Sequence, residues 1–444
     1  MNEELKKSIA ASIENTRFDI LQMIELGRQL IDHPGEIHHG PVVSMGVPKD
    51  TLPKWDDIQI LTAQLHKKPL MDDAPVDTQL VIGPRAQNPL VLDIPLLVGD
   101  MSYGALSKRA KQALSKGADL AGTAICSGEG GILGDELELN QSYMFELGSA
   151  RNGLKKNSDL SQFAKDFKGK VKAFHFKGGQ AAKTGTGGHL PGGKVTEEIA
   201  RARQIEVGKD AISPSTFADF HTPRDFADFA DQIRGQMGGI PIGFKISANH
   251  IEDDMRFALD AGADYIILDG RGGSTGAAPG IFRDHISVPT IAALARARKF
   301  LDAAGHEKGG KNSVTLIITG GLRIPSDFIK ALALGADGIA LANSALQAIG
   351  CTGARICYSG DCPAGIATHA QHLVNKIDVD ARARDLALFF TGSVHLMKIM
   401  TRACGHHSLR EFTRDDICTW KAEMSRLAGI PYAGVDPSIS DRRN

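Results

Sequence analysis

The sequence lacks the features that mark secreted, membrane-spanning and nucleic-acid-binding proteins. Its six cysteines in 444 residues are too few for a secreted disulfide framework, and its first residues lack the long apolar core of a signal peptide. No run of about 18 apolar residues occurs, so no membrane span is predicted. The 51 basic and 52 acidic side chains give a formal charge of −1, which leaves no net basic character for binding nucleic acid or lipid. We therefore expect a cytoplasmic protein that binds neither membrane nor nucleic acid.

Glycine, in contrast, is abundant. The 49 glycines cluster in short runs between apolar segments, as in loops that approach a phosphate or a cofactor. We predict three parts: a helical and irregular N-terminal segment (1–93) that wraps the barrel, a barrel (94–371), for which about 250 residues suffice, and a helical C-terminal segment (372–444). In the first part, the spacing of apolar residues predicts a helix from residue 4 to about 32 and a short helix near Trp55–Leu65.

From residue 94 onward, short β-rich runs alternate with helical stretches, which is the pattern of a parallel α/β fold. Eight such runs predict a TIM (β/α)8 barrel. A doubly wound open sheet is the alternative, but no Gly-x-Gly-x-x-Gly follows the first run. The predicted strands are Pro95–Asp100, Ala121–Ser127, Val171–Lys177, Asp210–Ser213, Pro241–Ser247, Asp264–Asp269, Thr315–Thr319 and Gly338–Ala342. The predicted helices between them include Ser107–Ala121, Thr222–Gln236, Glu252–Ala261 and Pro325–Leu334.

Glycine-rich loops directly follow several predicted strands, at the face where barrel enzymes place their sites. The loops after the seventh and eighth strands of such barrels commonly bind phosphate through backbone N–H groups and a helix N-terminus. A single glycine pair is more often a simple turn, but three loops together predict a phosphate site. The residues concerned are Gly272, Gly273, Gly320, Gly321, Asn343 and Ser344.

Polar side chains at the same face predict a flavin and a dicarboxylate substrate. Lys245 lies in a predicted strand and either extends to solvent or points into the barrel mouth, where its charge would stabilise the anionic N1–C2=O edge of a reduced flavin. Gln180 is placed to hydrogen-bond the same ring. Arg151 and Lys183 are candidates for binding the substrate carboxylates, with solvated surface charge as the alternative. Glu129 is either a loop carboxylate or a polar group near the reacting centre.

Three of the six cysteines lie in the loop 350–365, just beyond the last predicted strand. Cys351, Cys357 and Cys362 form the pattern C-x5-C-x4-C-P, and a proline after the last cysteine is common where cysteines bind clusters. Three thiolates leave a tetrahedral zinc site one ligand short, whereas a 3Fe-4S cluster needs only three. Three unrelated buried thiols are the alternative reading.

The region from about Ile94 to Gln371 resembles the FMN-binding synthase domain of glutamate synthases, and the cysteine spacing is that family's 3Fe-4S spacing. The resemblance implies that Met101 and Ser102 also bind FMN. It further implies that 2-oxoglutarate and ammonia form 2-iminoglutarate, and that reduced FMN, supplied with electrons through the cluster, delivers hydride to it to give L-glutamate. The matching motifs are Met101-Ser-Tyr-Gly-Ala-Leu-Ser107, Ser127-Gly-Glu-Gly-Gly131, Gln180-Ala-Ala-Lys183, Gly187-Gly188, Leu190-Pro-Gly192, Ile212-Ser-Pro214, Gly272-Gly-Ser-Thr-Gly-Ala277, Gly320-Gly-Leu-Arg323 and Cys362-Pro-Ala-Gly-Ile-Ala-Thr368.

The sequence also departs from the family pattern. No cysteine precedes Cys126, so the nucleophile of a glutaminase domain is missing, and no C-x2-C-x2-C run of a ferredoxin type is present. The chain ends soon after Ala433, where a β-helical domain normally follows the barrel. We therefore expect an external electron-donor protein, separate glutaminase-like and β-helix-like partner subunits, and an oligomer.

These departures leave the substrate and the activity open. A stand-alone chain of this kind is also similar to the catalytic subunit of N-methylglutamate synthase, which implies methylamine and glutamate as alternative substrates. A non-catalytic regulatory barrel subunit is a further alternative. Thr184 and Thr186 stand where large synthases usually carry proline and glutamate, and Phe217-Ala218 replace a typical histidine pair, so the amine or the acid can differ.

Overall fold

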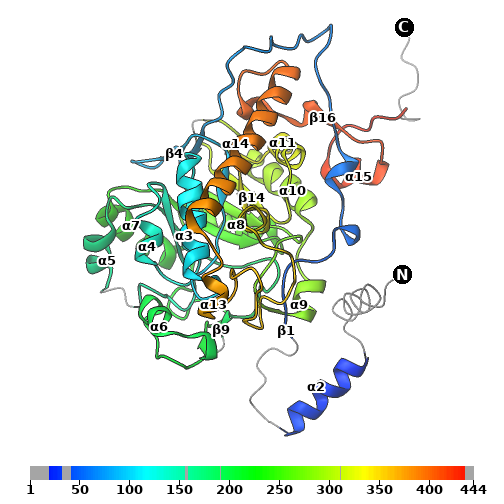
Figure 1. Ribbon diagram of the computed structural model, residues 1–444. Helices are drawn as coiled ribbons and strands as arrows, with labels where there is room; N and C mark the ends of the chain where they lie inside the picture. The colour runs from blue at the N-terminus through cyan, green and yellow to red at the C-terminus, as the bar shows by residue number, and fades with distance from the viewer. Residues whose placement is uncertain (1–19, 33–41, 156–158, 191, 311, 436–444) are drawn as a thin grey trace.

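The computed structural model describes residues 20–32, 42–155, 159–190, 192–310 and 312–435 (Figure 1). Its centre is a closed barrel of eight parallel strands, so the predicted TIM-barrel fold is confirmed. In barrel order the strands are β5 (Leu96–Val98), β6 (Ile125–Cys126), β7 (Tyr143–Leu147), β8 (Val171–Lys177), β11 (Ile242–Ser247), β12 (Tyr265–Asp269), β14 (Thr315–Thr319) and β15 (Gly338–Leu341).

One of the eight predicted strands was wrong, and one true strand was missed. The predicted strand Asp210–Ser213 lies outside the barrel, where β10 (Ala211–Ile212) pairs antiparallel with β9 (His189–Leu190). The third barrel strand is instead β7, whose five residues are all buried. Its apolar run is interrupted by Glu146, which is why the periodicity did not reveal it. Val171–Lys177 is therefore the fourth strand of the barrel and not the third.

Helices cover the barrel, and the four named above between the predicted strands agree with the structure to within one residue. Local sequence explains their ends. In α7 (Pro223–Met237), Thr222 and Asp225 form a capping box, proline stands at the first turn, and Gly238 ends the helix with φ +82°. The other α-helices are α2 (Ile20–Asp32), α3 (Lys108–Leu120), α4 (Gly134–Leu137), α5 (Leu160–Phe167), α6 (Glu197–Arg203), α8 (Ile251–Asp260), α9 (Gly280–His285), α10 (Thr290–Ala303), α11 (Pro325–Ala333), α12 (Asn343–Ala348), α13 (Gln371–Val374), α14 (Val379–Ala403) and α15 (Ala422–Ala428). Short 3₁₀-helices are η1 (Lys49–Thr51), η2 (Trp55–Asp57), η4 (Gly192–Lys194), η5 (Leu409–Glu411) and η6 (Arg414–Asp416).

The N-terminal segment contributes to the barrel core and to its rim. The hairpin of β3 (Leu80–Ile82) and β4 (Leu90–Leu92) packs with inward-facing strand residues in one apolar cluster. At the rim, β1 (Val42–Val43) pairs with β13 (Ala278–Pro279). The helix predicted near Trp55–Leu65 was wrong, because that stretch forms only η2 and then β2 (Gln59–Ile60), which pairs with β16 (Ile417–Cys418). Of the helix predicted from residue 4, residues 4–19 lie outside the described residues.

The C-terminal segment is anchored along the outside of the barrel. The long helix α14, orange in Figure 1, lies beside α3, cyan in the same view, and the two are in extensive contact. Their close approach depends on Gly117, where a Cβ atom would lie 2.8 Å from the carbonyl oxygen of Ala383. Among the described residues, no helix is both long and apolar enough to cross a membrane.

Candidate active site

Three cavities open at the carboxyl ends of the barrel strands, and Gln180 lines all three. The side cavity, of about 320 Å³, is walled by Phe176, Phe217 and Phe220 and reaches Lys177 and Lys183. The glycine cavity, of about 40 Å³, is lined by Gly272, Gly273, Gly320, Gly321, Asn343 and Lys245. The cysteine cavity, of about 300 Å³, is lined by Met101, Ser102, Glu129, Lys183, Cys351, Cys357 and Cys362. With the exceptions of Arg151 and Ser344, each predicted site residue therefore lines at least one of three cavities that share Gln180.

The glycines of the glycine cavity bring two loops into direct contact. Gly320 has φ +124°, and a Cβ atom there would lie 2.6 Å from the carbonyl oxygen of Gly270. A Cβ atom on Gly272 would lie 2.8 Å from the carbonyl oxygen of Gly320. In the described part of the chain, the N–H groups of Gly321 and Leu322 donate to no backbone carbonyl, although both residues line the cavity. These amides are therefore available to an anion, as a phosphate site requires.

Replacing Gly320 with alanine is expected to lower the free energy of unfolding by about 1–3 kcal/mol, because φ +124° and the 2.6 Å approach are both unfavourable for a side chain. Urea unfolding measures this change, and titration with FMN tests whether the predicted phosphate site is weakened with it. Gly235→Ala is the matched control, since Gly235 lies inside α7 with nothing within 4 Å of its Cβ position, and this variant should be at least as stable as the wild type. Equal stability of both variants would contradict the proposed loop contact.

Lys245 points into the barrel and is held by buried carboxylates. Its Nζ lies 2.8 Å from Oδ2 of Asp100 and 3.5 Å from Oε2 of Glu146. Burial alone would lower the pKa of Lys245, but these two carboxylates outweigh it and raise that pKa above its ordinary value. Burial would likewise raise the pKa of Asp100, yet Lys245 and His175 hold it well below its ordinary value. Lys245 is thus a fixed positive charge at the floor of the glycine cavity, as the flavin prediction requires.

Glu129 lies between two lysines where the side and cysteine cavities meet. The Nζ of Lys177 lies 3.0 Å from Oε2 of Glu129, and the Nζ of Lys183 lies 3.8 Å from Oε1. Burial would raise the pKa of Glu129, but Lys177 and Lys183 outweigh it and lower that pKa. Burial lowers the pKa of Lys183 in spite of Glu129. Lys183 is therefore the less firmly paired ammonium group and is the better placed to bind a substrate carboxylate.

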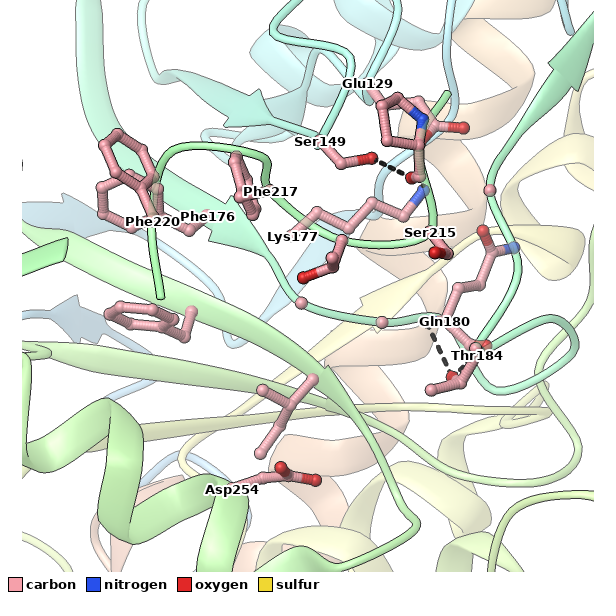
Figure 2. Close-up of a pocket in the computed structure, with 18 of the residues that line it drawn as sticks. Glu129, Ser149, Phe176, Lys177, Gln180, Thr184, Ser215, Phe217, Phe220 and Asp254 are labelled. Atoms are coloured by element: carbon pink, nitrogen blue, oxygen red, sulfur yellow. Dashed lines mark hydrogen bonds and ion pairs between the residues drawn. The ribbon is translucent and has the colours of Figure 1, made fainter. Parts of the chain in front are cut away.

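The side cavity has an aromatic wall on one side and a polar loop on the other. Figure 2 shows the rings of Phe176, Phe217 and Phe220 together at one end, with Gln180 and Thr184 at the other. The hydroxyl of Thr184 donates to the carbonyl oxygen of Gln180 at 2.8 Å, so this residue stabilises the loop itself. The cavity therefore offers an apolar surface next to the lysine pair.

The three loop cysteines line one cavity without converging on a single point. Burial raises the pKa of Cys351 and Cys357, and the latter also feels the charges of both neighbouring loop thiols. Among the described residues, the three sulfur atoms are not gathered within 4.8 Å of one another, as the ligands of one ion would be. A cluster in which each thiolate binds its own iron atom has no such requirement, so the donor set fits a polynuclear centre.

Two predicted residues lie elsewhere. Arg151 has φ +52°, forms an ion pair with Asp219 and stacks over the rings of Phe220 and Phe229 at 5.2 Å. It is absent from the described residues that line the three cavities, so the geometry assigns it to the outer wall of the side cavity and gives no support to a substrate contact. Ser344 is buried, and its hydroxyl donates to the carbonyl oxygen of Leu322 at 3.3 Å, which leaves Asn343 as the cavity-lining member of that pair.

Several site residues were not predicted. Asp100 and Lys177 stand at the last positions of two predicted strands, which is a signal that sequence reasoning had available. Arg323, in the motif after the seventh strand, also lines the glycine cavity and donates to Asn343. Met45 lines the cysteine cavity from the irregular N-terminal segment, where no sequence pattern marked it.

Comparisons with known proteins give consistent results. Residues 46–407 match the family described as the conserved region in glutamate synthase. An archaeal glutamate synthase (NADPH) of Methanocaldococcus jannaschii is 35% identical over 343 residues, which cover 77% of this chain and 63% of that protein. A glutamate synthase large subunit-like protein of Rhizobium meliloti (strain 1021) is 32% identical over 407 residues, covering 87% of this chain and 89% of that protein. A mutant flavocytochrome b2 solved with benzoylformate shares the fold, at a TM-score of 0.56 and 15% identity, with 90% of this chain and 88% of that chain covered. The chain thus spans less than two thirds of the length of the archaeal relative.

Proposed function

The chain belongs to the glutamate synthase family, and from this premise we propose that it is an FMN- and iron–sulfur-dependent synthase that forms L-glutamate from 2-oxoglutarate and ammonia. The observation that carries the proposal is the meeting of the glycine cavity, the lysine pair and the cysteine loop at Gln180. An anion site, a fixed cation, a carboxylate-binding lysine and a thiolate trio are the parts that this reaction needs.

The glycine cavity supports FMN as the cofactor. The amides of Gly321 and Leu322 and the guanidinium of Arg323 would hold its phosphate, and Lys245 and Gln180 would hold its ring. When bound, FMN would supply hydride to the imine carbon of 2-iminoglutarate. The three loop thiolates would hold the 3Fe-4S cluster.

The chain's own residues bind and orient the substrate. Lys183 binds a carboxylate of 2-oxoglutarate, and Lys177 keeps Glu129 ionised beside it. Because its pKa is lowered, Glu129 is a poor proton donor at neutral pH, so we assign it to orienting the two ammonium groups. Val42 and Met45 of the N-terminal segment line the cysteine cavity and so limit the access of water from that side.

Replacing Lys183 with methionine tests this function. We expect kcat/KM for 2-oxoglutarate to fall by at least about 100-fold, because a buried charge-assisted contact is lost, while the FMN content stays the same. The assay is anaerobic glutamate formation by dithionite-reduced protein. Lys209→Met, which removes an exposed ion pair with Glu206, is the control and should be fully active. Undiminished activity of the Lys183 variant in complex with its partners would favour a regulatory subunit instead.

The aromatic wall of the side cavity favours a second candidate amine. Phe217 replaces a histidine of the family pattern and turns an apolar ring toward the cavity, which suits a methyl substituent. In this alternative, methylamine and L-glutamate give N-methyl-L-glutamate and ammonia. Offering the reduced protein 2-oxoglutarate with ammonia and, separately, glutamate with methylamine decides between the two.

We also propose that electrons come from a separate donor protein and that glutaminase-like and β-helix-like subunits join this chain in an oligomer. The exposed position of Tyr358, next to Cys357, supports electron entry at the cysteine loop. Co-purification of the chain from its own cells, followed by measurement of the mass of the complex, tests this proposal.

A further inference from the structure

A buried histidine lies beneath the site, and the function proposed above does not use it. His175 belongs to β8, and its imidazole is fully buried inside the barrel. Its Nε2 lies 2.9 Å from Oδ1 of Asp100, and its Nδ1 lies 3.0 Å from the hydroxyl of Tyr265 on β12, the next strand but one in the barrel. Asp100 is thus held from two sides, by His175 at one oxygen and by Lys245 at the other, 2.8 Å away.

The charges around the imidazole favour its protonated form. Asp100 and Glu146 both face it, and among the described residues Lys245 is the only ammonium group near both carboxylates. Lys177 reaches Glu146 only at 3.8 Å, since its closer partner, at 3.0 Å, is Glu129. A positive charge on His175, added to that of Lys245, balances the two negative charges of Asp100 and Glu146.

The surroundings of Glu146 also indicate that His175 is protonated. Both of its carboxylate oxygens are buried without a hydrogen-bond partner, and Oε2 lies 3.6 Å from Nε2 of His175. Such a carboxylate is stable only among positive charges. The other titratable groups facing the imidazole are Cys126 and Tyr265, and burial raises the pKa of both, that of Cys126 to about 12, so both stay neutral. Burial would lower the pKa of His175, but the charge of Asp100 and its hydrogen bond to the imidazole act to raise it.

We propose that His175 is a positioning residue that carries a positive charge and, through Asp100, holds the ammonium group of Lys245 at the floor of the glycine cavity. Without this contact, one oxygen of a buried carboxylate loses its donor, and Asp100 is free to turn away from Lys245. The part of the inference that concerns the flavin rests on the proposed function.

The charge of His175 is tested without any cofactor. Protein labelled with 15N-histidine is compared as the wild type and as His175→Gln, so that the missing signals identify His175. We expect imidazolium shifts that stay unchanged from about pH 6 to pH 9. Signals of a neutral imidazole at pH 7 would overturn the proposed charge.

The positioning role has two readouts. Sulfite binds an oxidised flavin more tightly when a positive charge stands beside the ring, so its affinity reports the place of Lys245. In the FMN-loaded protein, His175→Leu should weaken sulfite binding by at least about tenfold, and His175→Gln, whose amide can still donate to Asp100, should recover most of that loss. Tyr143→Phe removes a comparably buried hydroxyl, bonded to Glu136 at 3.2 Å, and is the control that should stay within about twofold of the wild type.

The second readout is a double-mutant cycle of His175→Gln and Lys245→Met in urea unfolding. We expect the two changes to be non-additive, because they share Asp100. Additive changes, or a sulfite loss in the Tyr143 control as large as in His175→Leu, would reject the positioning role. If the wild type binds no FMN, the proposed function fails, while the NMR experiment and the cycle still decide the role of His175.

Discussion

Replacing Cys357 with serine is expected to abolish glutamate formation driven by a reduced donor protein, by at least about 100-fold, and to remove the iron–sulfur absorbance. Cys357 lines the same cavity as Cys351 and Cys362, and three thiolates are the smallest set that holds a 3Fe-4S cluster. The lysine pair and the glycine cavity are untouched by the change. Protein reduced chemically, with the donor bypassed, should therefore keep most of its single-turnover activity. Iron analysis and the two assays measure this split.

The matched control for this experiment is Cys418→Ser. Cys418 is buried, whereas Cys357 is half-buried, and it lies in β16, outside the residues that line the three cavities. We expect full iron content and full activity in both assays for this variant. Loss of donor-driven activity in both serine variants, or full iron content in the Cys357 variant, would show that the loop does not hold the cluster.

Replacing Lys111 with methionine is expected to lower the free energy of unfolding by about 3–5 kcal/mol, because it leaves a buried carboxylate without its cation. Lys111 and Glu136 are both fully buried, and their ion pair spans 2.7 Å. The ammonium group also donates to the carbonyl oxygens of Met101, of Cys126 at 3.4 Å and of Ser127 at 3.2 Å. It therefore ties together the two loops that carry site residues. Urea unfolding measures the change, and FMN affinity should fall with it.

The pH dependence of this destabilisation identifies its cause. Burial raises the pKa of Glu136 from 4.5 to about 7 in spite of Lys111, so the folded protein binds this proton more tightly than the unfolded chain does. The wild type therefore loses stability as the pH rises from 4.5 to about 7. At higher pH, Glu136 is ionised in both the folded and the unfolded state, so it causes no further loss of stability. Without Lys111 the pKa of Glu136 rises again, so the loss continues above pH 7.

Lys116→Met is the matched control for Lys111→Met. Lys116 lies on the same helix, α3, and its ion pair with Asp380 has the same length of 2.7 Å, but the two side chains are 39% and 62% exposed. Its loss should change the free energy of unfolding by at most about 1 kcal/mol. The double variant Lys111→Met with Glu136→Leu should recover part of the stability. Equal effects of the two lysine variants would contradict the predicted penalty for the buried charge.

The fold could be predicted from the sequence because most barrel strands are short apolar runs separated by helices with clear ends. The failure at β7 has a physical reason. A strand whose inward-facing residue is Glu146 does not read as apolar, and that carboxylate is part of the charge cluster beneath the site. The sequence pattern was thus least informative where the barrel interior carries charge.

The site was predicted at the level of residue types and loops, but not at the level of pairs. For Lys245 the sequence left open an exposed position and one inside the barrel; the structure shows the latter, yet nothing in its own strand identifies Asp100 as its partner. Arg151 and Lys183 were both candidates for binding the substrate carboxylates, and distant residues separate them in the structure. The guanidinium of Arg151 stacks over the rings of Phe220 and Phe229, whereas Lys183 lines the cysteine cavity. Such distinctions depend on contacts between elements, which periodicity does not encode.

The contacts of Ser44, in the N-terminal segment, restrict the order in which the site can form. Ser44 donates to the carbonyl oxygen of Gly276 at 2.7 Å and accepts from the backbone N–H of Tyr358 at 3.1 Å, partners that are 232 and 314 positions away. Contacts this distant in sequence carry a high loop-closure entropy. On the ribosome, the second of them cannot form until most of the chain has been made. Ser44 is among the first described residues to be synthesised, yet its contact with the cysteine loop at Tyr358 can form only after all eight barrel strands have been made.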